Sequence, residues 1–180
     1  LPPNLRQLQV AGHSDSSGKL KPLPGLVDLR LLYLGPGDVL AAEPEAFSAV
    51  PNILGLSMSY NTIKVIGSWF GKTRKLTKLD LGWNEIKEIK SNAFRPLVKL
   101  EFLSLKHNRL CAVEEGYFTG LTKLEILHLS YNNISYVAWK ALGKLTKLQM
   151  LALAHNHLLS IPHDSLTALR RVKTVNVEEN

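Results

Sequence analysis

Few residues in this chain could perform covalent chemistry. Its single cysteine, Cys111, comes four residues after His107, which resembles a thiol nucleophile and its base. Such a nucleophile also needs a third group that orients the base, and donors that stabilise an oxyanion, and the sequence shows neither. We therefore expect Cys111 to be an ordinary, partly buried thiol.

Other catalytic signatures are missing from the sequence. It has no Gly-rich phosphate loop and no H-E-x-x-H motif, and we identify no carboxylate pair at matching places in adjacent strands. The sequence accordingly predicts a protein that is not an enzyme and that uses no cofactor.

Histidines raise the question of a metal site, because the chain has six of them. His107 and His155 occupy equivalent places two copies apart in the repeat described below, which separates them by ~10 Å. Metal ligands lie about 2 Å from a shared ion, so these two rings could not bind one without rearranging. We expect no metal site.

One glycosylation signal is present, at Asn133-Ile134-Ser135. An N-x-S sequence is modified only where it is exposed in a secreted protein. Asn133 follows a structural asparagine, Asn132, and should face outward. The sequence therefore predicts a usable glycosylation site if the chain is secreted.

An internal repeat must position all of these side chains. The pattern L-x-x-L-x-L-x-x-N-x-L recurs every 24 residues, with one interval of 23. The copies start at Leu5, Leu29, Ile53, Leu76, Leu100, Leu124, Leu148 and Val172. Such a period is the signature of a solenoid, in which each repeat packs on its neighbours. We expect one domain over residues 1–180.

The apolar columns of this repeat predict its core. Leucines two residues apart, such as Leu79 and Leu81, share one face of a short strand and point inward. An aromatic and leucine column fills the wider outer half; its members are Phe47, Phe70, Phe94, Phe118, Leu142 and Leu166. A column of β-branched residues lies between these two sets. Its members are Ile66, Ile89, Val113, Val137 and Ile161.

An asparagine column marks the place where the chain turns out of each strand. An amide side chain both donates and accepts, so it can satisfy buried backbone groups and link to a neighbouring turn. The column consists of Asn61, Asn84, Asn108, Asn132, Asn156 and Asn180. His13 and Gly37 replace it in the first two copies, which are degenerate, and the polar segment 14–22 should make that end less regular.

With these columns the chain resembles the typical extracellular subclass of leucine-rich repeats, found in Toll-like receptors, variable lymphocyte receptors, small leucine-rich proteoglycans and axon-guidance proteins. The resemblance rests on the 24-residue period with phenylalanine in its outer half and covers essentially the whole chain. It implies an α/β solenoid: a right-handed horseshoe with a concave parallel sheet of about eight short strands and an irregular convex side.

Members of that subclass usually carry cysteine-rich caps at both ends, and this sequence has none. An uncapped solenoid end leaves apolar side chains and unpaired strand groups in water. We therefore expect a fragment of a longer array, or an open end that packs against another chain, a second copy included.

Candidate binding residues are the strand side chains that point away from the core. Two places after the repeat start, Phe102, Ile126 and Met150 should form an apolar ridge, because contiguous exposed apolar surface usually marks a contact site. Small residues should flank the ridge and leave it accessible. The full set of candidates is Tyr60, Lys78, Trp83, Phe102, His107, Ile126, His128, Tyr131, Met150 and His155. For the rings directly before the asparagine column, local packing is the alternative explanation.

A basic stripe precedes the repeat starts, at Lys75, Lys99, Lys123, Lys147 and Arg171. On neighbouring strands these like charges lie ~4.8 Å apart, inside a Debye length of ~8 Å. A solvated face is the usual explanation of such a run. The functional alternative is an anionic glycan or lipid phosphate; nucleic acid ranks last, because the rings and the cations do not interleave.

Bulk properties fit this picture. A 45% hydrophobic and 21% charged composition is that of one folded domain, and the net charge of +7 permits acidic partners. No apolar run approaches the ~18 residues that would span a bilayer, and the first residues do not resemble a signal peptide.

These observations predict a non-catalytic recognition module of extracellular or cell-surface location. Our first hypothesis is an innate-immune or pattern-recognition receptor ectodomain that binds a protein or microbial ligand on its concave face. The alternative is an extracellular matrix or adhesion protein that binds proteins and sulfated glycans.

Overall fold

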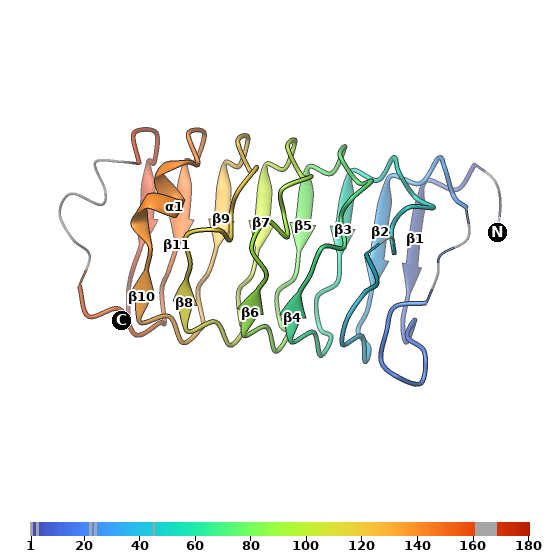
Figure 1. The fold of residues 1–180 in the computed structure, drawn as a ribbon, viewed down its shortest axis with the longest axis horizontal. Helices are drawn as coiled ribbons and strands as arrows, with labels where there is room; N and C mark the ends of the chain where they lie inside the picture. The colour runs from blue at the N-terminus through green and yellow to red at the C-terminus, as the bar shows by residue number, and fades with distance from the viewer. Residues whose placement is uncertain (1, 3, 22, 24, 45, 161–168) are drawn as a thin grey trace.

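The computed structural model describes residues 2, 4–21, 23, 25–44, 46–160 and 169–180, and it shows a parallel-strand solenoid (Figure 1). Eight short strands form one parallel sheet and follow one another in chain order across it. They are β1 (Gln7–Val10), β2 (Leu31–Leu34), β3 (Gly55–Ser57), β5 (Lys78–Asp80), β7 (Phe102–Ser104), β9 (Ile126–His128), β11 (Met150–Ala152) and β12 (Thr174–Asn176). The predicted leucine-rich-repeat solenoid is confirmed.

The pairing register follows the period of the sequence. Phe102 of β7 pairs with Ile126 of β9, which pairs with Met150 of β11, so partners are 24 residues apart. Gly55 pairs with Lys78 across the single interval of 23. Equivalent places of successive repeats therefore lie side by side.

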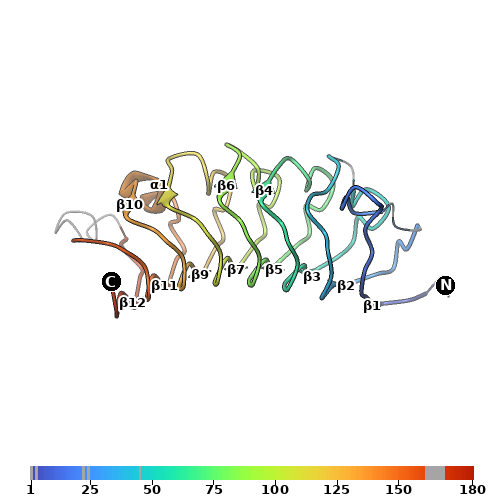
Figure 2. The same cartoon turned by 90° about the horizontal axis from the view of Figure 1, so that it is seen from below.

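The side of the solenoid away from this sheet is mostly irregular, as expected, and contains a few short elements (Figure 2). It carries two short parallel pairs, β4 (Val65–Ile66) with β6 (Glu88–Ile89) and β8 (Ala112–Val113) with β10 (Tyr136–Val137), and one short helix, α1 (Trp139–Gly143). The β-branched column brings these strands together, because Ile66, Ile89, Val113 and Val137 are all buried.

The two small sheets do not join in the described part of the chain. Between the repeats, burial raises the pKa of the Tyr117 hydroxyl, and a backbone hydrogen bond from Ile89, in β6, opposes the shift.

The core is the predicted set of columns. Phe47, Phe70 and Phe94 are almost fully buried and stack in sequence, with ring centroids 5.9 Å apart at both steps. Burial of each ring stabilises the fold by roughly 1.5–3 kcal/mol. Leu142, in α1, takes the aromatic place and is buried too. The expected members Ile161 and Leu166 lie outside the described residues.

The asparagine column links each repeat to the preceding one. In Asn108 the amide nitrogen donates to the carbonyls of Leu81, one repeat earlier, and of Leu105, both at 3.0 Å. Its oxygen accepts a hydrogen bond of 2.9 Å from the Ile86 backbone. Asn61, Asn84, Asn132 and Asn156 repeat the arrangement and are buried.

The first two repeats lack this asparagine, and one consequence is visible. His13, in its place, buries its Nε2 with no hydrogen-bond partner among the residues that the structure describes. The polar segment that follows is nevertheless ordered by its own contacts. The Asp15 carboxylate accepts hydrogen bonds from the backbones of Ser17 (2.7 Å) and Lys19 (3.1 Å), and Ser14 forms an antiparallel bridge with Leu20.

Candidate ligand-binding face

The outward face of the eight-stranded sheet carries the expected apolar ridge, but its three members differ in exposure. Met150 is exposed to 36%, whereas Phe102 and Ile126 are half-buried. The ring of Phe102 packs tilted against His128, with centroids 5.7 Å apart. Lys78 continues the same row on β5 and is exposed. The ridge is therefore most exposed at β11. One side of the Phe102 ring packs against His128, and the other side remains for a ligand.

The row beside the ridge differs from the expectation. Asp80, Ser104, His128 and Ala152 are cross-strand neighbours in this order. We expected small residues that leave the ridge accessible, but Ser104 is 2% exposed and Ala152 is also buried. The packing of Phe102 against His128 explains the burial of Ser104, the small residue between the larger neighbours. Its Oγ has no hydrogen-bond partner in the described part of the chain.

A continuous stack of aromatic rings borders this face. Tyr60, Trp83, His107, Tyr131 and His155 come one from each of five successive repeats. Their successive centroids are 5.4, 3.6, 4.1 and 4.1 Å apart, and no pair of planes departs from parallel by more than 16°. We refer to these five residues as the ring stack. The three inner rings stack on a neighbour at both faces, while Trp83 and Tyr131 remain exposed.

Backbone geometry produces the stack. All five residues have positive φ, between 51° and 60°. This left-handed region disfavours side chains with a Cβ and costs roughly 1–2 kcal/mol per residue. The cost recurs at these five repeats because the chain turns here toward the asparagine column. The left-handed turn also aims each ring along the solenoid axis, at the ring of the next repeat.

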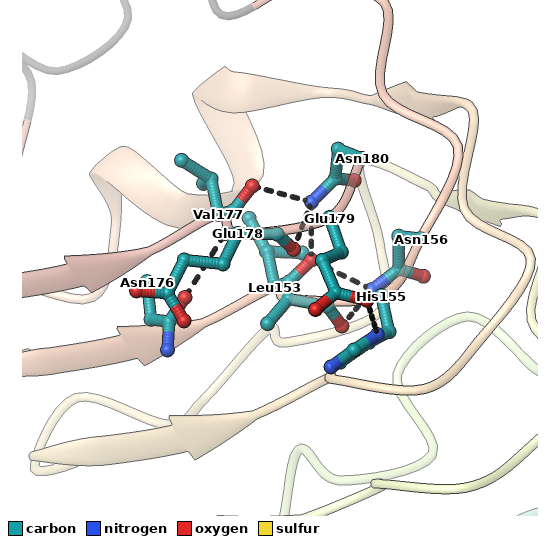
Figure 3. A network of polar contacts seen from close by, with 9 residues as sticks. Leu153, His155, Asn156, Asn176, Val177, Glu178, Glu179 and Asn180 are labelled. Carbon is teal, nitrogen blue, oxygen red and sulfur yellow. Dashed lines mark hydrogen bonds and ion pairs between the residues drawn. The ribbon is translucent and has the colours of Figure 1, made fainter.

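The last ring of the stack is held by an acidic partner (Figure 3). The His155 Nδ1 lies 3.0 Å from a Glu179 carboxylate oxygen. The backbone N–H of His155 donates to the carbonyl of Glu178 (2.9 Å), and the Asn180 amide donates to Leu153 (3.0 Å) and Val177 (2.8 Å). The repeat after the stack is thus tied to it by both backbone and side chains.

Two histidines of this face have lowered pKa values. Burial lowers the pKa of His107 below its usual 6.5, and the nearby Lys106 and His155 add to the effect. Burial also lowers the pKa of His128, with a further contribution from Lys106 that Asp80 partly opposes. Both rings are therefore neutral at physiological pH, which suits stacking and apolar contact.

The basic stripe borders the opposite edge of the sheet, where the strands begin. Lys75, Lys99, Lys123, Lys147 and Arg171 are all exposed. The Nζ of Lys75 donates a hydrogen bond to the side-chain oxygen of Asn52, at 2.7 Å. Toward β12 the stripe lines a groove of about 610 Å³, in which Glu101, Glu125, Gln149 and Lys173 form the inner wall.

One expectation about carboxylates is wrong. Glu101 and Glu125 stand at matching places of adjacent repeats, and the Glu125 backbone N–H donates to the Glu101 carbonyl at 2.8 Å. The pair could have been found in the sequence, one place after the repeat start. Both side chains are exposed beside cations, an arrangement that lacks the shielded environment of an acid–base pair.

Cys111 is exposed, not partly buried as expected. Its thiol contacts the Arg109 carbonyl at 3.8 Å, while the His107 ring lies between Trp83 and Tyr131. The spacing of Cys111 and His107 therefore does not produce a nucleophile and base. Asn133 is exposed on the turn after β9, as the glycosylation signal requires.

Within the described ranges, no group of three or more His, Cys, Asp or Glu side chains could hold a metal ion. The helix found in the same ranges is far too short to span a bilayer.

Relatives of known sequence are receptors. The chain is 35% identical over 98 residues to leucine-rich repeat-containing G-protein coupled receptor 5 of Xenopus tropicalis and 34% identical over 98 residues to its human counterpart. Each match covers 54% of this chain and 11% of the relative. The chain thus spans only about a tenth of the length of these receptors.

Solved structures share the fold over most of the chain. The Drosophila Toll–Spatzle complex gives a TM-score of 0.77 at 25% identity, covering 89% of this chain and 24% of that one. A leucine-rich-repeat protein of Leptospira interrogans gives 0.78 at 24% identity, covering 99% and 50%. Residues 65–110 and 103–158 match the family model of the leucine rich repeat, which is more than half of the chain, and the chain therefore belongs to the leucine-rich-repeat family.

Proposed function

We propose that this chain is a non-catalytic recognition module of an extracellular receptor, of the innate-immune or pattern-recognition kind, and that it binds a protein or microbial ligand on the outward face of its sheet. The observation that carries the proposal is the apolar ridge of Phe102, Ile126 and Met150 on adjacent strands, on a face that the ring stack borders.

This surface has the composition of a binding site. Aromatic residues and methionine are enriched at protein interfaces, and a few of them usually carry most of the binding energy. Met150 and Trp83 are exposed to 36% and 41%, so both can bury further area against a ligand. The ring stack and the asparagine column hold the surrounding backbone, which lowers the entropy that binding must overcome.

The relatives support this class of function. The matched sequences are named receptors, and the matched Toll structure is a complex with Spatzle. A protein ligand is therefore our first expectation. An extracellular location and a glycan on Asn133 belong to the same proposal.

A binding screen tests the proposal. The purified chain is immobilised and exposed to a panel of secreted proteins, microbial lipopeptides and lipopolysaccharide. Any ligand is then measured against Phe102→Ala and Met150→Ala, which should each weaken binding by ~2 kcal/mol or more, mainly through faster dissociation.

Tyr136→Ala is the matched control. Tyr136 is an exposed aromatic residue on β10, away from the large sheet, so its loss should leave affinity unchanged. If Tyr136→Ala weakens binding while Phe102→Ala and Met150→Ala bind like the parent, the ligand site is on the other side of the solenoid. A matrix or adhesion role, our alternative, would appear in the screen as binding to sulfated glycans alone.

A further inference from the structure

The groove at the start of the last strands contains cations that the sheet-face ligand does not use. Lys123, Lys147, Arg171 and Lys173 line it together with Glu125 and Gln149. Among the residues that the structure describes, none of the four cations forms an ion pair. Lys75, at the other end of the basic stripe, instead donates to Asn52.

The backbone fixes the inner wall of this groove. Lys173 donates its backbone N–H to Gln149, and Gln149 donates to Glu125, each at 2.8 Å. Equivalent side chains therefore recur at the spacing of strands, ~4.8 Å. Lys123, Lys147 and Arg171 of the basic stripe form an outer row, and Glu125, Gln149 and Lys173 form an inner row parallel to it.

These two parallel rows indicate which chemical groups a ligand of the groove must carry. The outer row attracts anionic groups spaced along a chain, and the planar guanidinium of Arg171 can bind one sulfate through two hydrogen bonds. The inner row of Glu125 and Gln149 would repel or ignore a simple polyanion, but it accepts hydrogen bonds from hydroxyl groups. A sulfated glycan carries both anionic groups and hydroxyl donors, whereas the DNA backbone has no donors and an acidic peptide has none on its carboxylates.

We infer that this groove, from Lys123 to Lys173, binds a sulfated glycan chain that runs across the strands. Sulfate groups contact Lys123, Lys147 and Arg171, and sugar hydroxyls donate to Glu125 and Gln149. This site is separate from the sheet-face ligand, so it stands whether or not the proposed receptor function is correct.

Heparin oligosaccharide of defined length is the probe, measured by calorimetry with the full chain. Lys147→Ala and Arg171→Ala should each weaken binding about tenfold, as expected for the loss of a charge-assisted hydrogen bond. Lys75→Ala is the matched control, since it removes the same charge from the same row outside the groove, and it should change affinity less than about twofold. Circular dichroism melting verifies that these exposed substitutions leave the fold intact.

Further probes separate the alternatives. Desulfated heparin should bind far more weakly than heparin. Poly-glutamate of equal charge should also bind more weakly than heparin, and Glu125→Ala should tighten its binding, because the Glu125 carboxylate repels it. Glu125→Ala should weaken heparin binding, because an acceptor for a hydroxyl is lost.

Three results would overturn the inference. Equal loss in Lys75→Ala and Lys147→Ala would indicate a general positive field. Tighter heparin binding by Glu125→Ala would show that this carboxylate only repels the ligand. Equal or stronger binding of poly-glutamate or duplex DNA, dependent on Lys147, would assign the groove to an acidic protein or to nucleic acid.

Discussion

The imidazole of His107 lies face to face with the indole of Trp83, with ring centroids 3.6 Å apart and planes 13° from parallel. The other face of the imidazole is covered by Tyr131. Both neighbouring residues, like His107 itself, are in the left-handed backbone region. A strained conformation and a stacking contact thus occur together in the five repeats of the ring stack, which allows their contributions to stability to be separated by mutation.

Trp83→Gly should be more stable than Trp83→Ala. Both variants lose the stacking contacts with Tyr60 and His107, but glycine adopts a φ of 55° without the steric cost that alanine bears. We expect a difference of about 1 kcal/mol in the free energy of unfolding, measured by denaturant titration. The order is opposite to that in an ordinary strand, where glycine is the less stable residue. Equal or lower stability of the glycine variant would contradict the role assigned to the backbone.

Asn108→Ala should destabilise the solenoid by ~1–3 kcal/mol. Alanine would leave the buried N–H of Ile86 without its acceptor. The carbonyls of Leu81 and Leu105 would each lose one of two amide donors and keep Asn84 and Asn132, respectively. Thermal melting provides the measurement, and Asn52→Ala, in a partly exposed loop, is the control that should melt near the parent. An unchanged melting temperature for Asn108→Ala would refute the role of the asparagine column.

Stability should fall as the pH is lowered through the range in which histidines titrate. The pKa values of His107 and His128 are lowered in the folded state, so between these values and the unfolded value of about 6.5 the unfolded chain binds more protons. Their contribution is fully present above pH 6.5 and is lost as pH falls through the folded pKa.

Melting temperatures between pH 7.5 and 5.5 measure this dependence. The double variant His107→Asn and His128→Gln cannot titrate at these places and should show a shallower loss. Asparagine is chosen at position 107 because it tolerates positive φ. An identical pH dependence in parent and double variant would assign the acid sensitivity to other groups.

The sequence predicts the leucine and phenylalanine columns well because each depends only on the period and on side-chain burial. The ring stack was harder to predict from the sequence. The ring types at Tyr60, Trp83 and His107 are visible in the sequence, but their face-to-face contact depends on a left-handed turn that tyrosine and tryptophan do not favour.

The exposure of individual residues on the sheet face could not be predicted from the sequence either. Ser104 reads as a small, exposed strand residue, and it is buried because Phe102 and His128 come together beside it. Tyr117 likewise meets Ile89 of the preceding repeat without any local signal in the sequence. Periodic features were therefore predictable, and contacts made by irregular large side chains were not.

Asn133 should carry a glycan when the chain is expressed through a secretory pathway. The side chain is exposed on the turn after β9, where the signal Asn133-Ile134-Ser135 presents its asparagine and serine to solvent. Intact mass spectrometry should show a glycan mass that both Asn133→Gln and Ser135→Ala remove, the second without altering the asparagine. Neither variant should lower the melting temperature by more than the glycan's own effect, because Ile134 supplies the buried contact of this turn. A secreted parent protein with unmodified Asn133 would argue against the extracellular assignment and leave the fold unaffected.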